Sequence, residues 1–138
     1  MAASTGYSGT PLARKLGFTA EMTVLTVGAP DEYQQWLAPL PDEVRFVARH
    51  AKPRAAHLFL TSRRELQRRL VALRASLVPD GFVWISWPKR SAGVATDITE
   101  DVIRAEALPL GFVDIKVCAV SEVWSGLKLV IRRSERAR

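Results

Sequence analysis

Four short apolar runs recur along the chain, at residues 22–27, 44–47, 55–60 and 82–87. Near-continuous apolar runs of about four to eight residues are typical of parallel strands that are buried on both faces of a sheet. The pattern therefore predicts a mainly parallel sheet. Its expected core on adjacent strands consists of Val24, Leu25, Leu58, Leu60, Val83 and Ile85.

Apolar residues at helical spacing predict helices that cover this sheet. The best-marked helix follows Thr61 and Ser62, either of which can accept a hydrogen bond from the first turn. Its apolar stripe consists of Leu66, Leu70, Leu73 and Leu77. Residues 11–16 and 31–40 predict two further helices, each of which flanks the first apolar run.

The last third of the chain predicts one more helix and two antiparallel strands. Asp97, with Glu100 three residues later, resembles a capping box at the start of that helix. The residues expected on its buried face are Ile98, Val102 and Ala105. Residues 113–120 and 127–132 alternate between apolar and polar side chains, so we expect two neighbouring strands at the edge of the sheet. The order of elements predicts an α/β protein of three layers.

The chain has 138 residues, of which 48% are hydrophobic, and this length suits one core. We expect a single domain over residues 1–138, with residues 1–9 as a flexible lead-in and residues 133–138 as a frayed basic tail. No signal-like segment and no apolar run of about 20 residues is present, so a cytoplasmic protein without membrane attachment is expected.

The formal net charge of +6 is unevenly distributed. Residues 45–90 contain eleven Lys or Arg and two acidic residues, whereas residues 97–122 contain six acidic residues and two basic ones. Such a segment usually forms a solvated face, but it can also bind nucleic acid or an acidic partner. Residues 63–74 contain no aromatic side chain on which a base could stack, so we expect only weak, sequence-independent nucleic-acid binding.

Catalytic and metal sites are hard to assemble from these residue types. The only cysteine, Cys118, lies in an apolar alternating run and is expected to be a small buried hydrophobe. Cys118, His50 and His57 have no metal-site spacing, and neither histidine adjoins a Ser or Cys nucleophile in the sequence. We therefore expect no metal and assign no catalytic residue.

Several strings resemble a short bacterial family known only as a domain of unknown function. They are GYSGTPL at 6–12, ISWPK at 85–89, TDITED at 96–101, and residues 113–118 together with WSGLKLVI at 124–131. The order strand, LVPDG, strand, helix, LGF and closing strand pair is similar to the second half of the class I methyltransferase fold. The resemblance implies a methyltransferase-like Rossmann topology and no particular reaction.

Two features that this resemblance implies for binding S-adenosylmethionine are missing. The larger methyltransferase family carries spaced glycines after the first strand and an acidic residue at the end of the second. Here Gly28 stands alone, Pro30 lacks a backbone donor, and residues 47–50 contain no carboxylate. Residues 51–54 are also too few for a third strand and helix, so the fold is expected to be trimmed by about one of each. We interpret the chain as a non-catalytic binding module, with a methyltransferase of atypical cofactor site as the alternative.

A ligand site, if present, is expected where the parallel strands end, because ligands of open α/β sheets bind outside the carboxyl ends of the strands. The candidate residues are Gly28, Pro30, Asp31, Thr61, Ser62, Trp87, Lys89, Arg90, Ser91, Thr96 and Asp97. Trp87 with Lys89 and Arg90 could bind a phosphate-bearing small molecule or an acidic protein segment. In the alternative interpretation, Trp87 is core, both cations are solvated and Asp97 only caps the helix that follows it.

Overall fold

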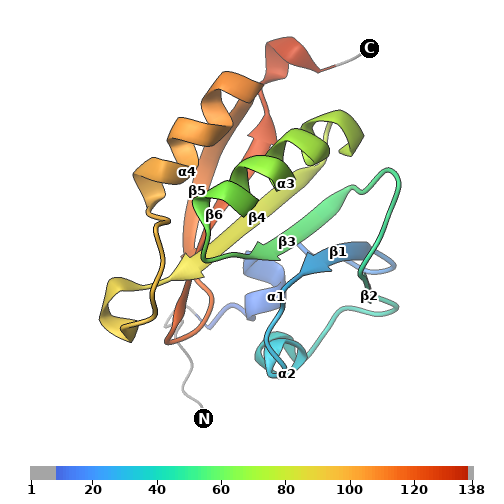
Figure 1. Cartoon of the computed structure of the whole chain (residues 1–138). Helices are drawn as coiled ribbons and strands as arrows, with labels where there is room; N and C mark the ends of the chain where they lie inside the picture. Colours follow the sequence, from blue (N-terminus) through green and yellow to red (C-terminus); the bar gives the residue numbers. More distant parts are fainter. Residues whose placement is uncertain (1–8, 137–138) are drawn as a thin grey trace.

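A computed structural model describes residues 9–136, which build one six-stranded mixed sheet with helices on both faces (Figure 1). The strands are β1 (Thr23–Val27), β2 (Arg45–Val47), β3 (Ala55–Phe59), β4 (Phe82–Pro88), β5 (Phe112–Ala119) and β6 (Trp124–Ile131). Their order in the sheet is β2-β1-β3-β4-β6-β5. The first four are parallel, and β6 is antiparallel to both of its neighbours.

Helices form the outer layers of this sandwich. They are α1 (Leu12–Lys15), α2 (Tyr33–Leu37), α3 (Arg63–Ser76) and α4 (Glu100–Ala107), with short 3-10 turns η1 (Arg90–Ala92), η2 (Leu108–Leu110) and η3 (Arg133–Glu135). Figure 1 shows α3 and α4 on one face of the sheet and α1 and α2 on the other. The expected three-layer α/β architecture is confirmed. Only seven residues, 48–54, connect β2 to β3, and they form neither helix nor strand.

The C-terminal strand pair is antiparallel, as expected, but only one of its strands lies at the sheet edge. β6 pairs with β4 over seven residues, from Phe82↔Val130 to Pro88↔Trp124, and separates β4 from β5. β6 can take this internal place because its side chains are buried on the α3 side, where Leu127, Leu129 and Ile131 join the core.

The core under α3 and α4 matches the predicted stripe. Leu66, Leu70, Leu73 and Leu77 are all buried and pack with Leu58, Leu60, Val83 and Ile85. Val24 is buried as well, but it belongs to the core on the opposite face, under α1 and α2, while its neighbour Leu25 packs toward α3. Successive residues of a strand face opposite sides of a sheet, so adjacent Val24 and Leu25 cannot share one core.

The core under α1 and α2 is rich in aromatic side chains. Trp84 lies at its centre, fully buried, and donates its indole N–H to the carbonyl of Leu16 over 2.7 Å. A buried indole N–H usually finds such an acceptor, and here it is the carbonyl of Leu16, the residue that ends the short helix α1. This hydrogen bond attaches α1 to the middle of β4.

Helix boundaries differ from the sequence expectation in two places. α2 spans only Tyr33–Leu37, shorter than residues 31–40. α4 is capped by Thr99, whose hydroxyl accepts the amide of Val102 over 3.1 Å, and not by Asp97. The start is therefore two residues later, and the buried face moves with it. Ile98 is buried as expected, but Ile103 and Ala107 complete the face, whereas Ala105 is exposed.

Two features concern the edges and the end of the chain. The β5–β6 pairing shifts register between Asp114 and Lys116, so Ile115 is an extra residue on the edge strand, as in a β-bulge.

Residues 133–136, expected to be frayed, contain η3, which Glu135 joins to Arg74 over 3.2 Å. Residues 1–8 and 137–138, the rest of the two expected mobile ends, lie outside the described residues. No helix within residues 9–136 is long and apolar enough to cross a membrane.

Candidate functional site

The loop after β1 lies directly against the end of β3. Gly28 has a φ of +69°, and a Cβ atom on it would lie 2.7 Å from the carbonyl oxygen of Phe59. Only glycine fits this left-handed position beside a neighbouring backbone. The carbonyl of Pro30 accepts the amide of Tyr33 over 3.0 Å and so starts α2, and Asp31 is exposed. Gly28 therefore serves close packing of the loop on β3.

Three hydrogen bonds join the loop before α4 to the start of α3, and a fourth lies within the loop itself. The hydroxyl of Thr96 donates to the carbonyl of Thr61 over 2.8 Å and accepts the amide of Ile98 over 3.0 Å. The carboxylate of Asp97 accepts the amide of Arg63 over 2.6 Å, and its own amide donates to Thr61. Asp97 thus satisfies a free amide of α3, and the expectation that it caps the following helix is wrong.

Ser62 completes the N-terminus of α3, because its hydroxyl accepts the amide of Glu65 over 3.3 Å. Its role as the cap of this helix was one of the two alternatives that the sequence left open. Together, Thr61, Ser62, Thr96 and Asp97 form one cluster at the carboxyl edge of the sheet. Their hydrogen bonds run to the chain's own backbone.

The remaining candidate residues at this edge lie outside that cluster. Trp87 is only 9% exposed and packs in the core under α3 and α4, the place that the alternative interpretation of the sequence gave it. Lys89 is half-buried and donates its amide to the carbonyl of Val123 over 2.7 Å. Arg90 and Ser91 are both exposed on η1, which projects from the end of β4 (Figure 1).

This edge does not fit S-adenosylmethionine as the resemblance would require. The loop after β1 has one glycine, Gly28, and the carbonyl of Phe59 fills the space beside it. Pro30 has no backbone amide to donate. Beyond the end of β2, Ala48, Arg49 and His50 are exposed and carry no carboxylate for a ribose. The two contacts that class I methyltransferases use at these positions have no equivalent there.

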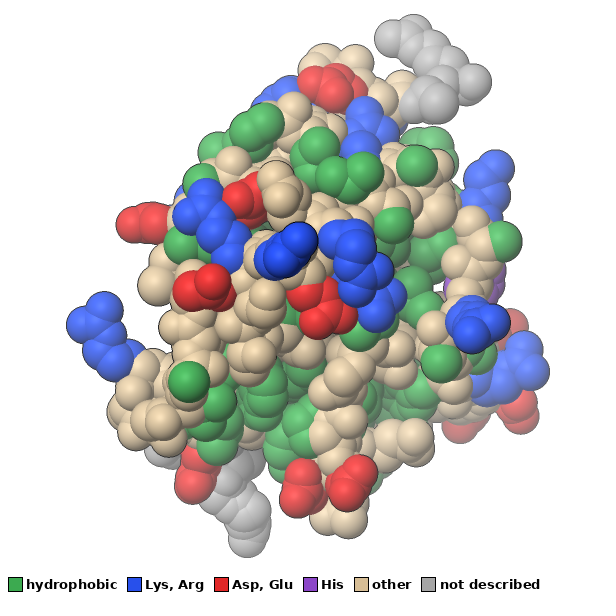
Figure 2. All heavy atoms as spheres, viewed as in Figure 1, with side chains coloured by type: hydrophobic (Ala, Val, Ile, Leu, Met, Phe, Trp, Pro, Cys, Tyr) green, Lys and Arg blue, Asp and Glu red, His purple; other side chains and the backbone are tan. Residues whose placement is uncertain are grey.

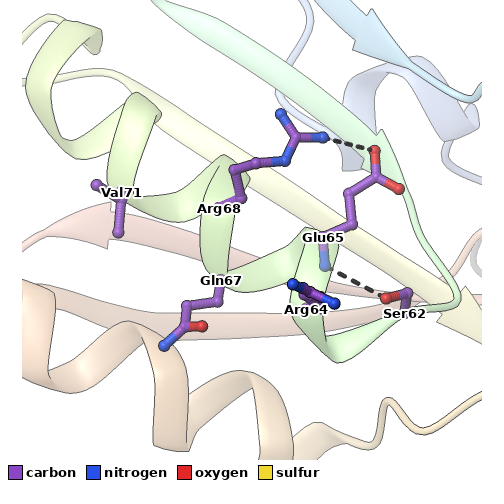
Figure 3. A pocket seen from close by; sticks show the side chains of 6 residues that line it. All are labelled: Ser62, Arg64, Glu65, Gln67, Arg68 and Val71. Carbon is purple, nitrogen blue, oxygen red and sulfur yellow. Dashed lines mark hydrogen bonds and ion pairs between the residues drawn. The ribbon is translucent and has the colours of Figure 1, made fainter.

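A shallow hollow of about 530 Å³ lies instead on the outer face of α3 (Figure 3). It is lined by Ser62, Arg64, Glu65, Gln67, Arg68 and Val71. Arg68 points back toward Glu65, and their charged groups are 3.6 Å apart. Arg64 has no carboxylate partner among the described residues. Of the candidates from sequence, only Ser62 borders this hollow.

The basic and acidic segments of the sequence meet in the fold. Arg63 pairs with Glu106 over 2.6 Å, and Arg74 pairs with Glu135. Arg104 holds three carboxylates, those of Glu100, Asp101 and Asp114. Figure 2 accordingly shows red side chains between the blue ones over α3. Arg63–Glu106 is thus the ion pair that joins the basic segment to the acidic one, whereas Arg104 neutralises carboxylates within the acidic segment.

A buried polar chain links three elements on the α2 face of the sheet. The two ring nitrogens of His57 on β3 lie 2.7 Å from the hydroxyl of Tyr33 and 2.8 Å from the hydroxyl of Ser86. All three residues are buried, with His57 and Ser86 at 0% exposure. Burial lowers the pKa of His57 to about 3 and raises that of Tyr33 above its usual range. The imidazole is therefore neutral at pH 7.

The network of Tyr33, His57 and Ser86 resembles a catalytic nucleophile and its base only in its residue types. A substrate must reach the nucleophile, and Ser86 is shielded on both sides by core residues. The network satisfies the buried polar side chains of β3 and β4 and attaches α2 to the sheet through Tyr33. Sequence reasoning assigned His57 no catalytic role, and its partners lie 24 and 29 residues away, so no local pattern indicated them.

Two expectations about metal ligands can be compared with the structure. Within residues 9–136 no group of three His, Cys, Asp or Glu side chains could hold a metal ion. Cys118 is half-buried rather than buried, and burial raises the pKa of its thiol above the usual value. Its side chain lies at the margin of the aromatic core under α1 and α2.

Comparison with known proteins identifies the architecture. No protein-family model and no protein of curated function matches the sequence. A methyltransferase dependent on S-adenosylmethionine from Aquifex aeolicus matches with a TM-score of 0.61 at 14% identity, over 87% of each chain. A type 11 methyltransferase candidate from Sulfolobus solfataricus gives 0.60 at 14% identity, over 92% of this chain and 93% of that one.

A magnesium protoporphyrin IX methyltransferase from Synechocystis is similar too, with a TM-score of 0.55 at 12% identity over 88% of this chain and 74% of that one. At such identities the likeness is one of fold, and activity does not follow from fold. The chain has a methyltransferase-like α/β fold, with the six-stranded sheet order β2-β1-β3-β4-β6-β5 and an antiparallel C-terminal pair.

Proposed function

We propose that this chain is a non-catalytic, methyltransferase-like module that acts by binding. One observation carries the proposal: the polar groups where a cofactor would lie are used within the chain itself. Thr96 and Asp97 bind the backbone at the start of α3, Ser62 caps that helix, and the loop at Gly28 is packed against Phe59. These contacts stabilise the edge of the sheet and occupy its polar side chains with backbone groups of the chain.

The competing function is a methyltransferase with an unusual cofactor site, and direct binding separates the two. Isothermal titration of the full chain with S-adenosylmethionine, and with its demethylated product, should give no binding tighter than about 10 μM, or roughly −7 kcal/mol. We expect this because the glycine-rich loop and the ribose carboxylate are both missing. A dissociation constant below that value for either compound would favour the methyltransferase.

A second candidate function, binding of an acidic protein segment, is favoured by the hollow on α3. Arg64 and Arg68 provide cations there, and Val71, which is 52% exposed, provides an apolar surface beside them. This combination suits a peptide with acidic and apolar residues. It suits nucleic acid less, because the lining residues include no aromatic side chain for stacking a base.

Charge-matched variants test this candidate. We expect Arg64→Gln/Arg68→Gln to weaken binding of a labelled acidic peptide about fivefold at low salt, since two exposed ion pairs together contribute roughly 1 kcal/mol. Arg45→Gln/Arg49→Gln, on and just after β2, removes the same charge and should leave affinity nearly unchanged. Equal losses of peptide affinity in both double variants would mean that binding depends on net charge alone. A low-micromolar complex with a short oligonucleotide at physiological salt would favour nucleic acid instead.

A further inference from the structure

Three lysines converge on the sheet face that carries α1. Lys15 ends α1, Lys116 lies on β5 and Lys128 lies on β6. Lys116 and Lys128 are directly opposite each other in the antiparallel pairing. The ammonium of Lys116 donates to the carbonyl of Lys15 over 3.3 Å. Three cationic side chains from three elements are thereby placed at one margin of the sheet.

This cluster lacks the carboxylates that accompany other cations of the fold. Arg54, Arg63, Arg74 and Arg104 each pair with Asp or Glu, whereas none of the three lysines forms an ion pair within the described part of the chain. Like charges directly opposite each other on paired strands are destabilising. The cluster therefore reduces stability unless an anion from outside joins it.

The ammonium of Lys128 is held in place without a hydrogen-bond acceptor among the described residues. It lies 4.4 Å from the ring centre of Phe82 and 5.9 Å from that of Trp84. A Cβ atom on Gly17 would lie 3.3 Å from this nitrogen, so the absence of a side chain there leaves room for it. Burial, and then the charge of Lys116, lower the pKa of Lys128. An anion bound beside it would offset the charge of Lys116.

The neighbouring thiol does not supply that anion. Burial raises the pKa of Cys118, although the charges of Lys15 and Lys116 act in the opposite direction, so the group is an uncharged thiol at neutral pH. Each ammonium offers three N–H donors, and Lys116 uses one of its three on the Lys15 carbonyl. Lys116 therefore keeps donors that no described residue accepts, beside the unpaired ammonium of Lys128.

We propose that Lys15, Lys116 and Lys128 form a binding site for the dianionic phosphate group of a small molecule. A phosphate brings two negative charges and several acceptor oxygens, and lysine ammonium groups bind phosphate as point charges. The site is built from residues other than those of the α3 hollow and lies on the opposite face of the sheet. Its test therefore does not depend on the proposed binding function of α3.

The experiment titrates inorganic phosphate into the full chain by calorimetry at constant ionic strength. We expect a dissociation constant of about 1 mM for the wild type and a loss of about tenfold in Lys116→Gln and in Lys128→Gln. Lys52→Gln is the matched control, because Lys52 is exposed in the β2–β3 loop and has no ion pair in the described structure. Its affinity should equal that of the wild type.

Thermal unfolding without phosphate provides a second, independent measurement. Lys116→Gln should raise Tm by about 1 to 4 °C, because it removes a repulsion between opposed like charges. Lys52→Gln should leave Tm unchanged. Phosphate binding that is absent in the wild type, or is equally weakened in Lys52→Gln, would overturn the proposal. Much tighter binding of a short oligonucleotide that requires Lys116 and Lys128 would overturn the small-molecule assignment and indicate a nucleic-acid backbone.

Discussion

Lowering the pH from 7 to 5 should reduce the free energy of unfolding by about 2 kcal/mol, through His57 alone. The pKa of His57 is about 3 in the folded protein and near 6.5 in the unfolded chain. Below pH 6.5 the unfolded chain therefore binds a proton that the folded protein does not. The stability linked to neutral His57 is complete above pH 6.5 and falls by about 1.4 kcal/mol per pH unit toward pH 3.

Urea denaturation at pH 7, 6 and 5 measures this slope. The range stays above the region where carboxylates such as Asp80 and Glu135 titrate, since their arginine partners lower their pKa values further. His50→Gln should keep the wild-type slope, whereas His57→Gln should flatten it while lowering stability at pH 7. If His57→Gln does not fold, the ring resonances of wild-type His57 should still show no titration above pH 4. Titration near pH 6.5 would contradict the buried network.

Leu73→Ala should destabilise the protein by about 2 to 5 kcal/mol, the range for buried Leu-to-Ala changes that leave a cavity. Leu73 is 5% exposed and packs between α3 and the sheet, in the same cluster as Val83 and Ile85. Leu73 lies within the continuous helix α3, so the surrounding structure cannot close fully around the space that its side chain leaves.

Val71→Ala is the matched control for this substitution, because Val71 lies on the same helix and is 52% exposed. Its effect should stay within about 0.5 kcal/mol. Both values come from denaturant unfolding monitored by circular dichroism. A midpoint for Leu73→Ala that equals that of Val71→Ala would mean that this face of α3 does not form the core.

The sequence predicted α3 well because a single helix carries all the necessary information. The spacing of Leu66, Leu70 and Leu73 defines the buried face, and Ser62 at the start supplies the cap. The parallel strands were predictable for a similar reason, since continuous apolar runs reflect burial on both faces. Such local patterns also led to the methyltransferase-like topology that the structural comparisons support.

The candidate site was less predictable, because its contacts join distant positions. Asp97 followed by Glu100 has the pattern of a cap for the next helix, yet its carboxylate binds Arg63, 34 residues earlier. Trp87 lies at the end of a strand, and only the packing of α3 and α4 decides that it is core. A local pattern cannot choose between two helix ends that the fold brings together.

The lysine cluster was hidden by the irregularity of β5. Simple alternation would place Asp114 and Lys116 on the same face, where they could form a pair. The extra residue between them shifts the register, so Asp114 pairs with Arg104 of α4 while Lys116 reaches the carbonyl of Lys15 in α1. The opposition of Lys116 and Lys128 follows from that shift.

The same bulge also bears on how copies of the protein behave when they are crowded together. β5 is an edge strand, and Ile115 and Val117 are 55% and 53% exposed on it, a combination that invites strand-to-strand growth between molecules. A second β5 laid antiparallel on the first would need an unbroken ladder across residues 114–116. The extra residue interrupts that ladder at its centre. Asp114 and Lys116 also face opposite sides of the sheet, so Asp114 of one molecule could not pair with Lys116 of another. A single inserted position thus gives the longer edge strand of the sheet a bulge of the kind that disfavours edge-to-edge pairing.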